Sequence, residues 1–477
     1  MSNVENFDLC IIGAGSGGLS VAAGAAQLGL SVALIEKDKM GGDCLNTGCV
    51  PSKALLEAAK VAQGFRKAEP FGIKAVEPEV DFSAVKDHVF GVIGVIEPHD
   101  SPERFEGLGA TVILEEARFL DSKMVQAGER VIRAKKFVIS TGSRAFVPPI
   151  EGLDAEKAFT NENIFDVREA PEHLIIIGGG PIGIEMAQAH RRLGCEVTVL
   201  DIGPIAPKDD PELVGILRIR LAEEGVDLRE HVSVKSVAHG AGTNVTVTIE
   251  EDGKSVEIKG SHLLVAAGRR PNVDLNLEKA GVDYGRRGIS VDKRLRTSKK
   301  HIFAIGDVAG GPQFTHVAGY HAGIIIRNIC FKMPAKVDYA ALPWVTYTDP
   351  ELGNVGMSEA MAIEAHGADN VKSVVWHFDE NDRGQASLRT EGMIKVVCTK
   401  KGKILGAGIV GPNAGELLSM WSLAIVKGMK IGDITSIIAP YPTMGEISKR
   451  AAGAWFTPSL FSDRTRKIVG FLQKLPF

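Results

Sequence analysis

The 477-residue chain has no run of about 20 consecutive apolar residues, the length that a membrane-spanning helix requires. Its start, Met1 to Asp8, is polar and acidic and lacks the apolar core of a secretory signal peptide. The chain also lacks a large excess of basic residues: a net charge of -4 and a pI near 6.3 argue against a dedicated nucleic-acid partner. We therefore expect a cytoplasmic globular protein of two to four domains.

Cysteine is scarce, at six residues, which favours catalysis over disulfide stapling in a chain of this length. Four of the six lie in or beside apolar stretches, where we expect buried packing residues. These four are Cys10, Cys195, Cys330 and Cys398.

The remaining two, Cys44 and Cys49, are five positions apart. In a regular helix, the Cα atoms of such residues are roughly 8–9 Å apart, whereas a disulfide tolerates at most about 7 Å. If the two pair, the segment must form an irregular turn, which Gly48 and Pro51 permit. A bridge in such a loop, next to Lys53, suits redox turnover better than structural stapling. Two buried thiols that never meet are the weaker alternative.

A dinucleotide-binding pattern opens the chain. The apolar run from Phe7 to Ile12 predicts a buried strand, a helix is expected from Leu19 to Leu28, and a second strand runs from Val32 to Ile35. Glu36 follows this strand, eighteen residues after the last glycine of the connecting turn, and can bind ribose hydroxyls. The turn contains Gly13, Gly15 and Gly18, whose backbone can approach a pyrophosphate at the helix N-terminus.

The pattern recurs later in the chain. The run from Leu174 to Ile177 predicts a strand, a helix extends through Leu193, and a strand from Glu196 to Leu200 ends at Asp201, again eighteen residues after the last glycine. Two such units imply two bound dinucleotides, and they are the nearest thing to an internal repeat. The glycines of this second turn are Gly178, Gly180 and Gly183.

The segments between and after these units are less distinctive. Residues from about 54 to 95 are expected to be helical, 110 to 144 form short strands, and 232 to 265 form a hairpin-rich sheet. Near residue 99, we favour a helix cap at Asp100 or Ser101. The alternative makes His99 an acid–base group near the cysteines.

The run from Gly41 to Lys53 resembles the active-site segment of the FAD-dependent pyridine nucleotide-disulfide oxidoreductases, and further motifs extend this resemblance over nearly the whole chain. The resemblance implies an α/β fold with two Rossmann-like dinucleotide-binding domains and a C-terminal α+β dimerisation domain, assembled as a homodimer. The domains expected are residues 1–150 and 271–341 for FAD, 151–270 for NAD(P)H, and 342–477 for dimerisation.

The same resemblance implies the cofactors FAD and NAD(H). FAD would contact the first glycine turn, Glu36 and Lys53, and NADH would contact the second turn and Asp201. A carboxylate at Asp201, without a following arginine, favours NADH over NADPH, and we expect Arg218 and Arg220 to be solvated surface charges. Further cofactor contacts implied by the family motifs are Gly42, Thr141, Gly142, Gly268, Asp307 and Ala318. We expect no resident metal site.

The family motifs also imply the catalytic path. Hydride passes from NADH to FAD and electrons continue to a Cys44–Cys49 disulfide, with Cys49 next to the flavin and Cys44 facing substrate. Glu185 stands where the family has a glutamate that pairs with the active-site lysine, here Lys53. A buried lysine without its carboxylate would be costly, which makes the pair plausible on energetic grounds as well.

Two residues depart from the family pattern. Asp43 stands where threonine is usual, in a loop expected near the FAD pyrophosphate. Tyr441 stands where dihydrolipoamide dehydrogenase and glutathione reductase have the histidine that protonates the substrate thiol, although Glu446 is kept. A phenol with a pKa near ~10 is a poor general base at neutral pH, whereas imidazole near ~6.5 is well matched.

These departures leave the electron acceptor open. The first hypothesis is a disulfide or dithiol of the lipoyl type. The second is a metal-ion reductase resembling mercuric reductase, which has tyrosine at the same point, although this chain has no cysteine after Cys398. A quinone or other acceptor is a further alternative, as is a redox-responsive binding protein in which turnover is incidental.

The C-terminal tail predicts an interaction surface. Ile468, Leu472 and Leu475 recur at helical spacing among basic residues. This pattern favours an apolar side packed on the protein's own dimer. The alternative is a basic amphipathic helix in weak contact with an anionic membrane surface.

Overall fold

The computed structural model describes residues 4–476, so Met1 to Asn3 and Phe477 lie outside the described residues. The chain forms two compact units. Unit 1 comprises the chain up to Ile202 together with Arg229–Val337, and unit 2 comprises Gly203–Leu228 together with the chain from Asp338 onward. The bounds of the four domain segments expected from the sequence stay predictions. Among the helices of residues 4–476, none combines the length and the apolar character needed to cross a bilayer.

Unit 1 contains a seven-stranded sheet in the order β3-β2-β1-β6-β5-β4, with β18 paired to β6. Strand β1 pairs in parallel with β2 and β6, and its residues from Leu9 to Ile12 are buried. A parallel strand buried on both faces needs such a continuous apolar run. The strands are β1 (Val4–Ile12), β2 (Val32–Glu36), β3 (Ala110–Leu114), β4 (Ala117–Asp121), β5 (Met124–Ala127), β6 (Arg130–Ile139) and β18 (Ile302–Ala304).

A second parallel arrangement follows in unit 1. Strand β8 pairs in parallel with β9 and β14 in a four-stranded sheet of order β10-β9-β8-β14. The expected hairpins form the antiparallel sheet β11-β12-β13. The bounds are β8 (His173–Ile177), β9 (Glu196–Leu200), β10 (Asp227–Arg229), β11 (Ser233–His239), β12 (Val245–Glu251), β13 (Lys254–Gly260) and β14 (His262–Val265). Two small ladders complete the unit: β7 (Ser143–Ala145) with β15 (Arg269–Pro271), and β16 (Tyr284–Gly285) with β17 (Gly288–Ile289).

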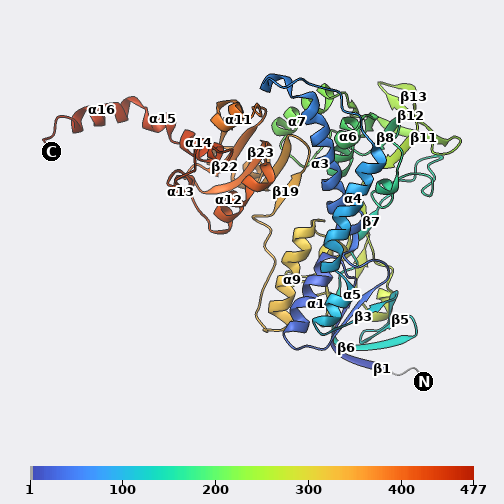
Figure 1. Ribbon diagram of the computed structural model, residues 1–477. Helices are drawn as coiled ribbons and strands as arrows, with labels where there is room; N and C mark the ends of the chain where they lie inside the picture. The colour runs from blue at the N-terminus through green and yellow to red at the C-terminus, as the bar shows by residue number, and fades with distance from the viewer. Residues whose placement is uncertain (1–3, 477) are drawn as a thin grey trace. The chain divides into compact units, whose positions relative to one another are not determined.

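The helices of unit 1 begin where the glycine turns end. Helix α1 follows β1 and lies beside α9 (Figure 1), and α6 follows β8. A Cβ on Gly17 would lie 3.3 Å from the Ala318 Cβ, so the glycine allows α1 and α9 to approach closely. The helices are α1 (Ser16–Gln27), α2 (Gly42–Asn46), α3 (Cys49–Arg66), α4 (Phe82–Ile96), α5 (Pro102–Gly107), α6 (Pro181–Arg192), α8 (Leu277–Ala280) and α9 (Thr315–Ile329).

The helical structure expected from about residue 54 to 95 is confirmed at both ends and is wrong in the middle. Helix α3 ends at Arg66 and α4 begins at Phe82, with only a single 3₁₀ turn, η1 (Glu69–Phe71), between them. Pro70 and Pro78 lack the N–H that an α-helix interior requires, which explains the interruption. The expected helix cap at Asp100 or Ser101 is confirmed: the Ser101 side chain accepts from the Arg104 N–H at 3.3 Å, and Pro102 is the first helical residue.

Unit 2 is built on a five-stranded antiparallel sheet of order β19-β20-β23-β22-β21. Helices pack around an apolar core in which the buried Trp421 donates its indole N–H to Ser448 Oγ at 3.1 Å. The strands are β19 (Pro343–Thr346), β20 (Glu351–Gly356), β21 (Val371–His377), β22 (Met393–Thr399) and β23 (Ile404–Gly411). The helices are α7 (Pro211–Glu223), α10 (Glu359–His366), α11 (Asp382–Ala386), α12 (Ala414–Val426), α13 (Ile431–Thr435), α14 (Glu446–Ala454), α15 (Thr457–Leu460) and α16 (Asp463–Leu472).

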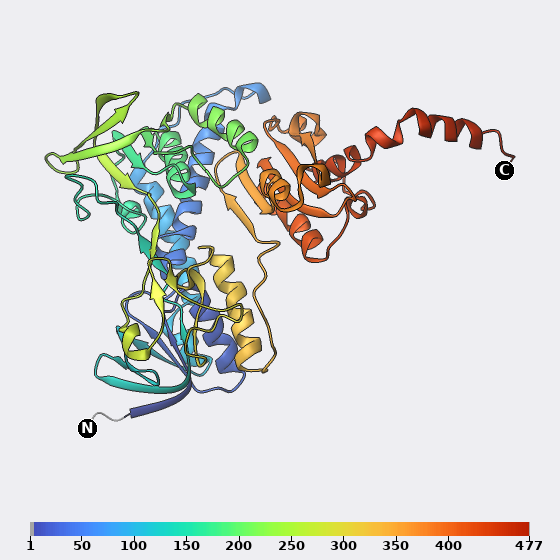
Figure 2. The same ribbon diagram turned by 180° about the vertical axis from the view of Figure 1, so that it is seen from behind.

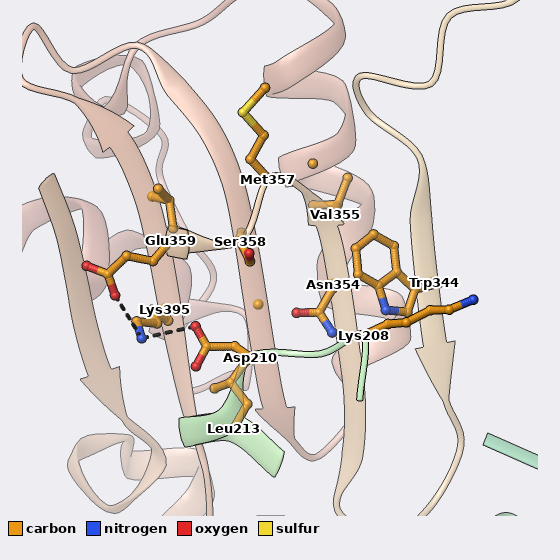
Figure 3. Close-up of a pocket in the computed structure, with 14 residues that line it drawn as sticks. Lys208, Asp210, Leu213, Trp344, Asn354, Val355, Met357, Ser358, Glu359 and Lys395 are labelled. Atoms are coloured by element: carbon orange, nitrogen blue, oxygen red, sulfur yellow. Dashed lines mark hydrogen bonds and ion pairs between the residues drawn. The ribbon is translucent and has the colours of Figure 1, made fainter. Parts of the chain in front are cut away.

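An ion cluster attaches α7 to this sheet (Figure 3). The Lys395 ammonium, on β22, lies 3.0 Å from Asp210, 2.9 Å from Glu212 and 3.0 Å from Glu359. These acidic neighbours hold the pKa of Lys395 above its usual value even though burial acts in the opposite direction. The adjoining cavity has a volume of about 10 Å³, close to the minimum for one water molecule.

The prediction that Arg220 is a solvated charge is wrong. Its side chain on α7 is only 13% exposed, and it forms ion pairs with Glu391 and with Glu223. Both partners lie in unit 2, so Arg220 reinforces the attachment of α7 within this unit.

A lysine is buried in unit 1 without a carboxylate at hydrogen-bond distance among the described residues. Lys86 on α4 is fully buried, donates to the Ile164 carbonyl at 3.3 Å, and has its ammonium 4.9 Å from the centroid of the Phe82 ring. Burial lowers the pKa of Lys86 to about 8. The neighbouring His190 is also buried, and burial lowers its pKa to about 3.

The Lys86→Met variant should be more stable than the native protein at pH 7. There Lys86 is protonated in both the folded and the unfolded state, and the folded state carries a buried charge. Between pH 8 and pH 10.5 only the unfolded state binds this proton, so native stability rises with pH by up to about 3 kcal/mol. The advantage of Lys86→Met, measured by denaturant unfolding, should therefore shrink as pH rises through this window. Lys60→Met, at an exposed lysine, is the control and should show no such trend; an equal trend in both would contradict the assignment.

Candidate active site

The two cysteines of the sequence motif lie on either side of a helix break. Cys44 is in α2 and Cys49 is the first residue of α3, with Thr47 and Gly48 between the helices. The segment therefore leaves the regular helical path, which is the geometry that pairing of the two cysteines would require. Gly42 has φ of 61°, and a Cβ there would lie 2.8 Å from the Gly15 Cα. Glycine at this position thus permits the cysteine segment to approach the first glycine turn.

Both cysteines are free thiols, and the acidity of each depends on the other. Donation from the Cys44 thiol lowers the pKa of Cys49 to about 6, assisted by the Thr315 hydroxyl 3.3 Å away and by the positive charge of Lys53. The same bond, with burial, raises the pKa of Cys44 far above its usual value. Cys49 is therefore the thiolate of the pair at neutral pH.

Two positive fields support this thiolate. Thr315 is the first residue of α9, so the positive end of a 15-residue helix faces Cys49. Lys53 follows Cys49 by one helical turn on α3 and therefore shares its face. The Lys53 ammonium lies 2.9 Å from Glu185 Oε2 on α6, so the structure brings together the two residues that the family motifs pair. The side chain of Glu185 is only 5% exposed.

The carboxylate of Asp43 has specific partners. Asp43 Oδ1 accepts from Asn161 Nδ2 at 2.9 Å and lies 3.2 Å from the Arg269 guanidinium. Arg269 also donates to Ser143 Oγ and to the Ser143 carbonyl, both at 2.8 Å. Ser143 in turn donates to Asp307 Oδ2 at 2.5 Å. Burial raises the pKa of Asp307, while this hydrogen bond and Arg269 oppose the rise.

The first glycine turn has the geometry of a dinucleotide site. A Cβ on Gly18 would lie 1.9 Å from the Gly13 carbonyl oxygen, so α1 can pack on β1 only with glycine there. Glu36 Oε2 accepts from the Ala14 N–H at 2.7 Å, which fixes the turn. Gly15 is the N-cap of α1, and within residues 4–476 no side chain caps this helix start. Its N–H groups therefore suit a pyrophosphate, and the residues present fit FAD.

The second turn repeats this geometry. A Cβ on Gly183 would lie 1.9 Å from the Gly178 carbonyl oxygen, and Asp201 Oδ2 accepts from the Gly179 N–H at 2.6 Å. Gly180 is the N-cap of α6, again without a side-chain cap in the described chain. The matching turns fit two dinucleotides, as the sequence predicts.

The other predicted cofactor contacts surround the first turn or follow strand ends. Thr141 donates to the Asn272 carbonyl at 2.7 Å, and Gly142 adopts φ of 65°. Gly268 adopts φ of 128° directly before Arg269, and a Cβ on Gly306, beside Asp307, would lie 3.3 Å from Ala318. Their roles toward cofactors stay predictions.

Tyr441 and Glu446 lie in unit 2. The Tyr441 side chain is 67% exposed, and its hydroxyl donates to Asp382 Oδ2 at 2.9 Å. This hydrogen bond raises the pKa of the phenol, which leaves still less phenolate available as a general base near neutral pH. Glu446 is the first residue of α14 and pairs with Arg450 at 3.0 Å.

His99 lies just before the helix cap at Ser101, and its role as an acid–base group stays a prediction. It ends the 3₁₀ turn η2 (Glu97–His99), and its carbonyl accepts from the Arg104 side chain. Sequence reasoning missed Arg269, Asn161 and Ser143, which the structure places around Asp43 and Asp307. The sequence feature that could have indicated these partners is Asp43, because a partly buried acid in such a loop requires a hydrogen-bond donor or a cation near it.

Comparison with known proteins agrees with this geometry. Residues 7–322 match the model of the pyridine nucleotide-disulphide oxidoreductase family, and residues 342–452 match that of its dimerisation domain. The chain belongs to this family. The oxidoreductase is 36% identical to a mercuric reductase of Staphylococcus aureus over 94% of its length and 82% of the relative. It is also 36% identical to a dihydrolipoyl dehydrogenase of Geobacillus stearothermophilus, covering 93% of this chain and 94% of that one.

A solved structure gives the same result at the level of the fold and the enzyme class. The Cu(II) complex of the HOCl-induced flavoprotein disulfide reductase RclA from Escherichia coli superposes with a TM-score of 0.82 at 26% identity, covering 93% of this chain and 99% of that one. Together, these relatives identify the chain as a FAD-dependent enzyme that uses a pyridine nucleotide. Its C-terminal domain is the family's dimerisation domain, and the oxidoreductase is a homodimer.

The reduced oxidoreductase should alkylate at Cys49 with a pH midpoint near 6, and at Cys44 only at alkaline pH. Iodoacetamide labelling located by peptide mass spectrometry measures both rates. Cys44→Ser keeps a hydroxyl donor to Cys49 and should preserve the low midpoint, whereas Cys44→Ala removes the donor and should raise it. With FAD bound, a long-wavelength thiolate–flavin absorption band should appear without reductant in Cys44→Ser but not in Cys49→Ser. Identical profiles for Cys44→Ser and Cys49→Ser would contradict the assignment of the thiolate.

Proposed function

We propose that the oxidoreductase transfers electrons from NADH to a soft metal ion that the Cys44 and Cys49 thiolates hold. The first glycine turn, with Gly13, Gly15 and Gly18, would hold FAD, which would supply hydride acceptance from the nicotinamide and an electron pair for the cysteines. One NADH provides the two electrons that convert Hg(II) to metallic mercury, and it leaves NAD⁺ and one proton. Thiolates are the ligands that soft metal ions prefer.

The observation that carries this proposal is the environment of Tyr441. Exchange with a dithiol substrate needs a group that removes and returns a thiol proton near neutral pH. Tyr441 has a raised pKa and already donates its proton to Asp382, so it is unsuited to that task. A metal ion needs no such base, because it displaces the thiol protons on binding. The mercuric reductases among the relatives support this acceptor class.

The chain's own residues prepare the electron donor. Lys53 and the N-terminus of α9 stabilise the Cys49 thiolate, and Glu185 fixes the Lys53 ammonium. Cys44 stays protonated until an acceptor arrives, because its thiol donates to Cys49. Binding of a metal ion by both sulfurs would release this proton. Asp201, at the end of β9, suits the free ribose hydroxyls of NADH.

A second candidate acceptor is a lipoyl-type disulfide or dithiol. Dihydrolipoyl dehydrogenase relatives of equal identity support it, as does the retention of Glu446 beside Tyr441. If the acceptor is of the lipoyl type, the absence of an imidazole at position 441 limits the rate of dithiol–disulfide exchange.

In side-by-side assays of NADH oxidation, Hg(II) should be a faster acceptor than lipoamide, glutathione disulfide or quinones. Tyr441→His should raise lipoamide turnover by about tenfold to a hundredfold, the lower part of what a positioned general base contributes. Tyr441→Phe should leave lipoamide turnover nearly unchanged and serves as the matched control. Fast lipoamide turnover in the native enzyme, with little response to Hg(II), would favour the second candidate and exclude the first.

We also propose that the C-terminal tail, residues 457–476, lies on an anionic lipid surface. None of the residues of α16 is buried, and Figures 1 and 2 show this helix extending away from the sheet of its unit. The match to the dimerisation domain ends at residue 452, before the tail begins. Seven large apolar side chains are each about half exposed or more: Leu460, Phe461, Ile468, Val469, Phe471, Leu472 and Leu475.

The charge of the tail favours an acidic surface. Its cations are Arg464, Arg466, Lys467 and Lys474, against the single acid Asp463. A short helix with exposed apolar side chains and flanking basic residues is the composition that binds the interface of anionic membranes.

Full-length protein should sediment with vesicles that contain an anionic lipid at low salt and should detach at high salt. Removing the residues after Pro458 should abolish sedimentation, and Arg466→Gln with Lys467→Gln should weaken it while keeping the apolar side chains. Neutral vesicles are the lipid control. If the full-length protein does not bind and the truncation instead lowers dimer stability, the tail packs on the partner subunit and the lipid proposal is wrong.

A further inference from the structure

Asp43 is the charged residue nearest in sequence to Cys44, and it lies on the α2 side of the helix break. Its carboxylate accepts from Thr47 Oγ1 at 3.1 Å and from Asn161 Nδ2 at 2.9 Å, and it meets Arg269 at 3.2 Å. Asn161 also donates to the Thr47 carbonyl at 3.2 Å. Asn161, 114 or more positions away in sequence, thus holds the cysteine segment at two points: at Asp43, just before Cys44, and at Thr47, between the two cysteines.

Asp43 also packs against the backbone of the helix break at Gly48. A Cβ added at Gly48 would lie 2.8 Å from Asp43 Oδ2 and 2.9 Å from the Asp43 carbonyl oxygen. The carboxylate therefore packs against the backbone that separates α2 from α3. A change at Asp43 acts directly on the turn that brings Cys44 and Cys49 together.

Arg269 is the counter-charge and is well shielded, with a side chain that is 12% exposed. Its guanidinium is shared between Asp43, Ser143 and Asp307, and it donates to Asn161 Oδ1 at 3.3 Å. A guanidinium divided among several acceptors neutralises each carboxylate only in part. Asp43 therefore retains some negative charge next to the thiol pair.

That charge opposes the positive groups at the site. Lys53 and the N-terminus of α9 favour a thiolate, whereas the Asp43 carboxylate, adjacent in sequence to Cys44 and packed against the Gly48 backbone, disfavours negative charge on the sulfurs. A dithiol whose thiolate is less stabilised is the stronger reductant, because its reduced form is less favoured relative to the disulfide.

We propose that Asp43, anchored by Arg269 and Asn161, is a positioning residue that holds the intercysteine turn and shifts the Cys44–Cys49 disulfide to a more negative reduction potential. This inference rests on the redox role of the cysteine pair, and it is independent of which acceptor the pair serves. A more negative potential would make the dithiol a stronger electron donor to its acceptor and its own reduction by NADH less favourable.

The test replaces the carboxylate in the full-length holoenzyme. Asp43→Asn keeps an oxygen that can accept from Asn161 but removes the charge, and Asp43→Thr removes both the charge and the anchor. Equilibration with dithiothreitol redox buffers, quenched by acid and read by peptide mass spectrometry, measures the dithiol fraction. Asp43→Asn should favour the dithiol by about threefold to tenfold, equivalent to ~15–30 mV, and should move the pH profile of cysteine alkylation to lower pH. Glu57→Gln, on the exposed face of α3, is the matched control and should change neither.

Each outcome decides the proposal. An unchanged dithiol fraction in Asp43→Asn would overturn the effect on potential, even if acceptor turnover fell. A shift in Glu57→Gln equal to that in Asp43→Asn would show a general charge effect and would also overturn it. If Asp43→Asn does not fold, Asp43→Glu, which keeps the charge, must shift the equilibrium less than Asp43→Thr. Because no acceptor is present, failure here is distinct from failure of Hg(II) or lipoamide turnover.

Discussion

Two thiols five positions apart can meet only if the backbone between them leaves the helical path, and every other feature of the site follows from this constraint. The break at Thr47 and Gly48 satisfies it, and the restart of the helix at Cys49 places Lys53 one turn away on the same face. The same break allows Cys44 to donate to Cys49. One local departure from regular structure therefore sets both the geometry of the thiol pair and the difference in acidity between its members.

The charged groups around the thiols alternate in sign, so that each one has an oppositely charged neighbour. Cys49 is negative, Lys53 beside it is positive, and Glu185 behind Lys53 is negative. On the other side, Asp43 is negative and Arg269 is positive. Each partly buried charge thus has an opposite neighbour, as the high cost of isolated buried charge requires. Among the described residues of unit 1, Lys86 differs, because it relies on a carbonyl and aromatic rings instead of an acid at hydrogen-bond distance, and burial lowers its pKa.

Local pattern accounts for most of what the sequence could predict. Strand, glycine turn, helix and a terminal acid recur with the same spacing, so both dinucleotide units, including Glu36 and Asp201, could be located from periodicity and glycine position alone. The pairing of Lys53 with Glu185 came from the family motif. The Arg269 contact could not be found this way, because it joins residues 43 and 269 and no local pattern encodes a contact over that separation. Helix α3 was expected to run too far because its apolar spacing continues weakly past Arg66, whereas the prolines at 70 and 78 decide where it ends. Arg220 looked solvated because its acidic partner Glu391 is distant in sequence.

The attachment of α7 through Lys395 bears on how the protein can be divided. Unit 2 takes up residues 203–228 from the middle of the chain, so the backbone passes between the two units three times, at 202/203, 228/229 and 337/338. A fragment that begins near residue 342 would therefore be incomplete. It would lose Asp210 and Glu212, two of the three acids that pair with Lys395. It would also lose Leu213, which covers Gly408: a Cβ built on Gly408 would lie 2.5 Å from Leu213 Cδ1. The match to the dimerisation domain marks a contiguous stretch of sequence, but the folded unit is discontinuous. A stable proteolytic fragment of unit 2 should therefore need residues 203–228 as well as the C-terminal part of the chain.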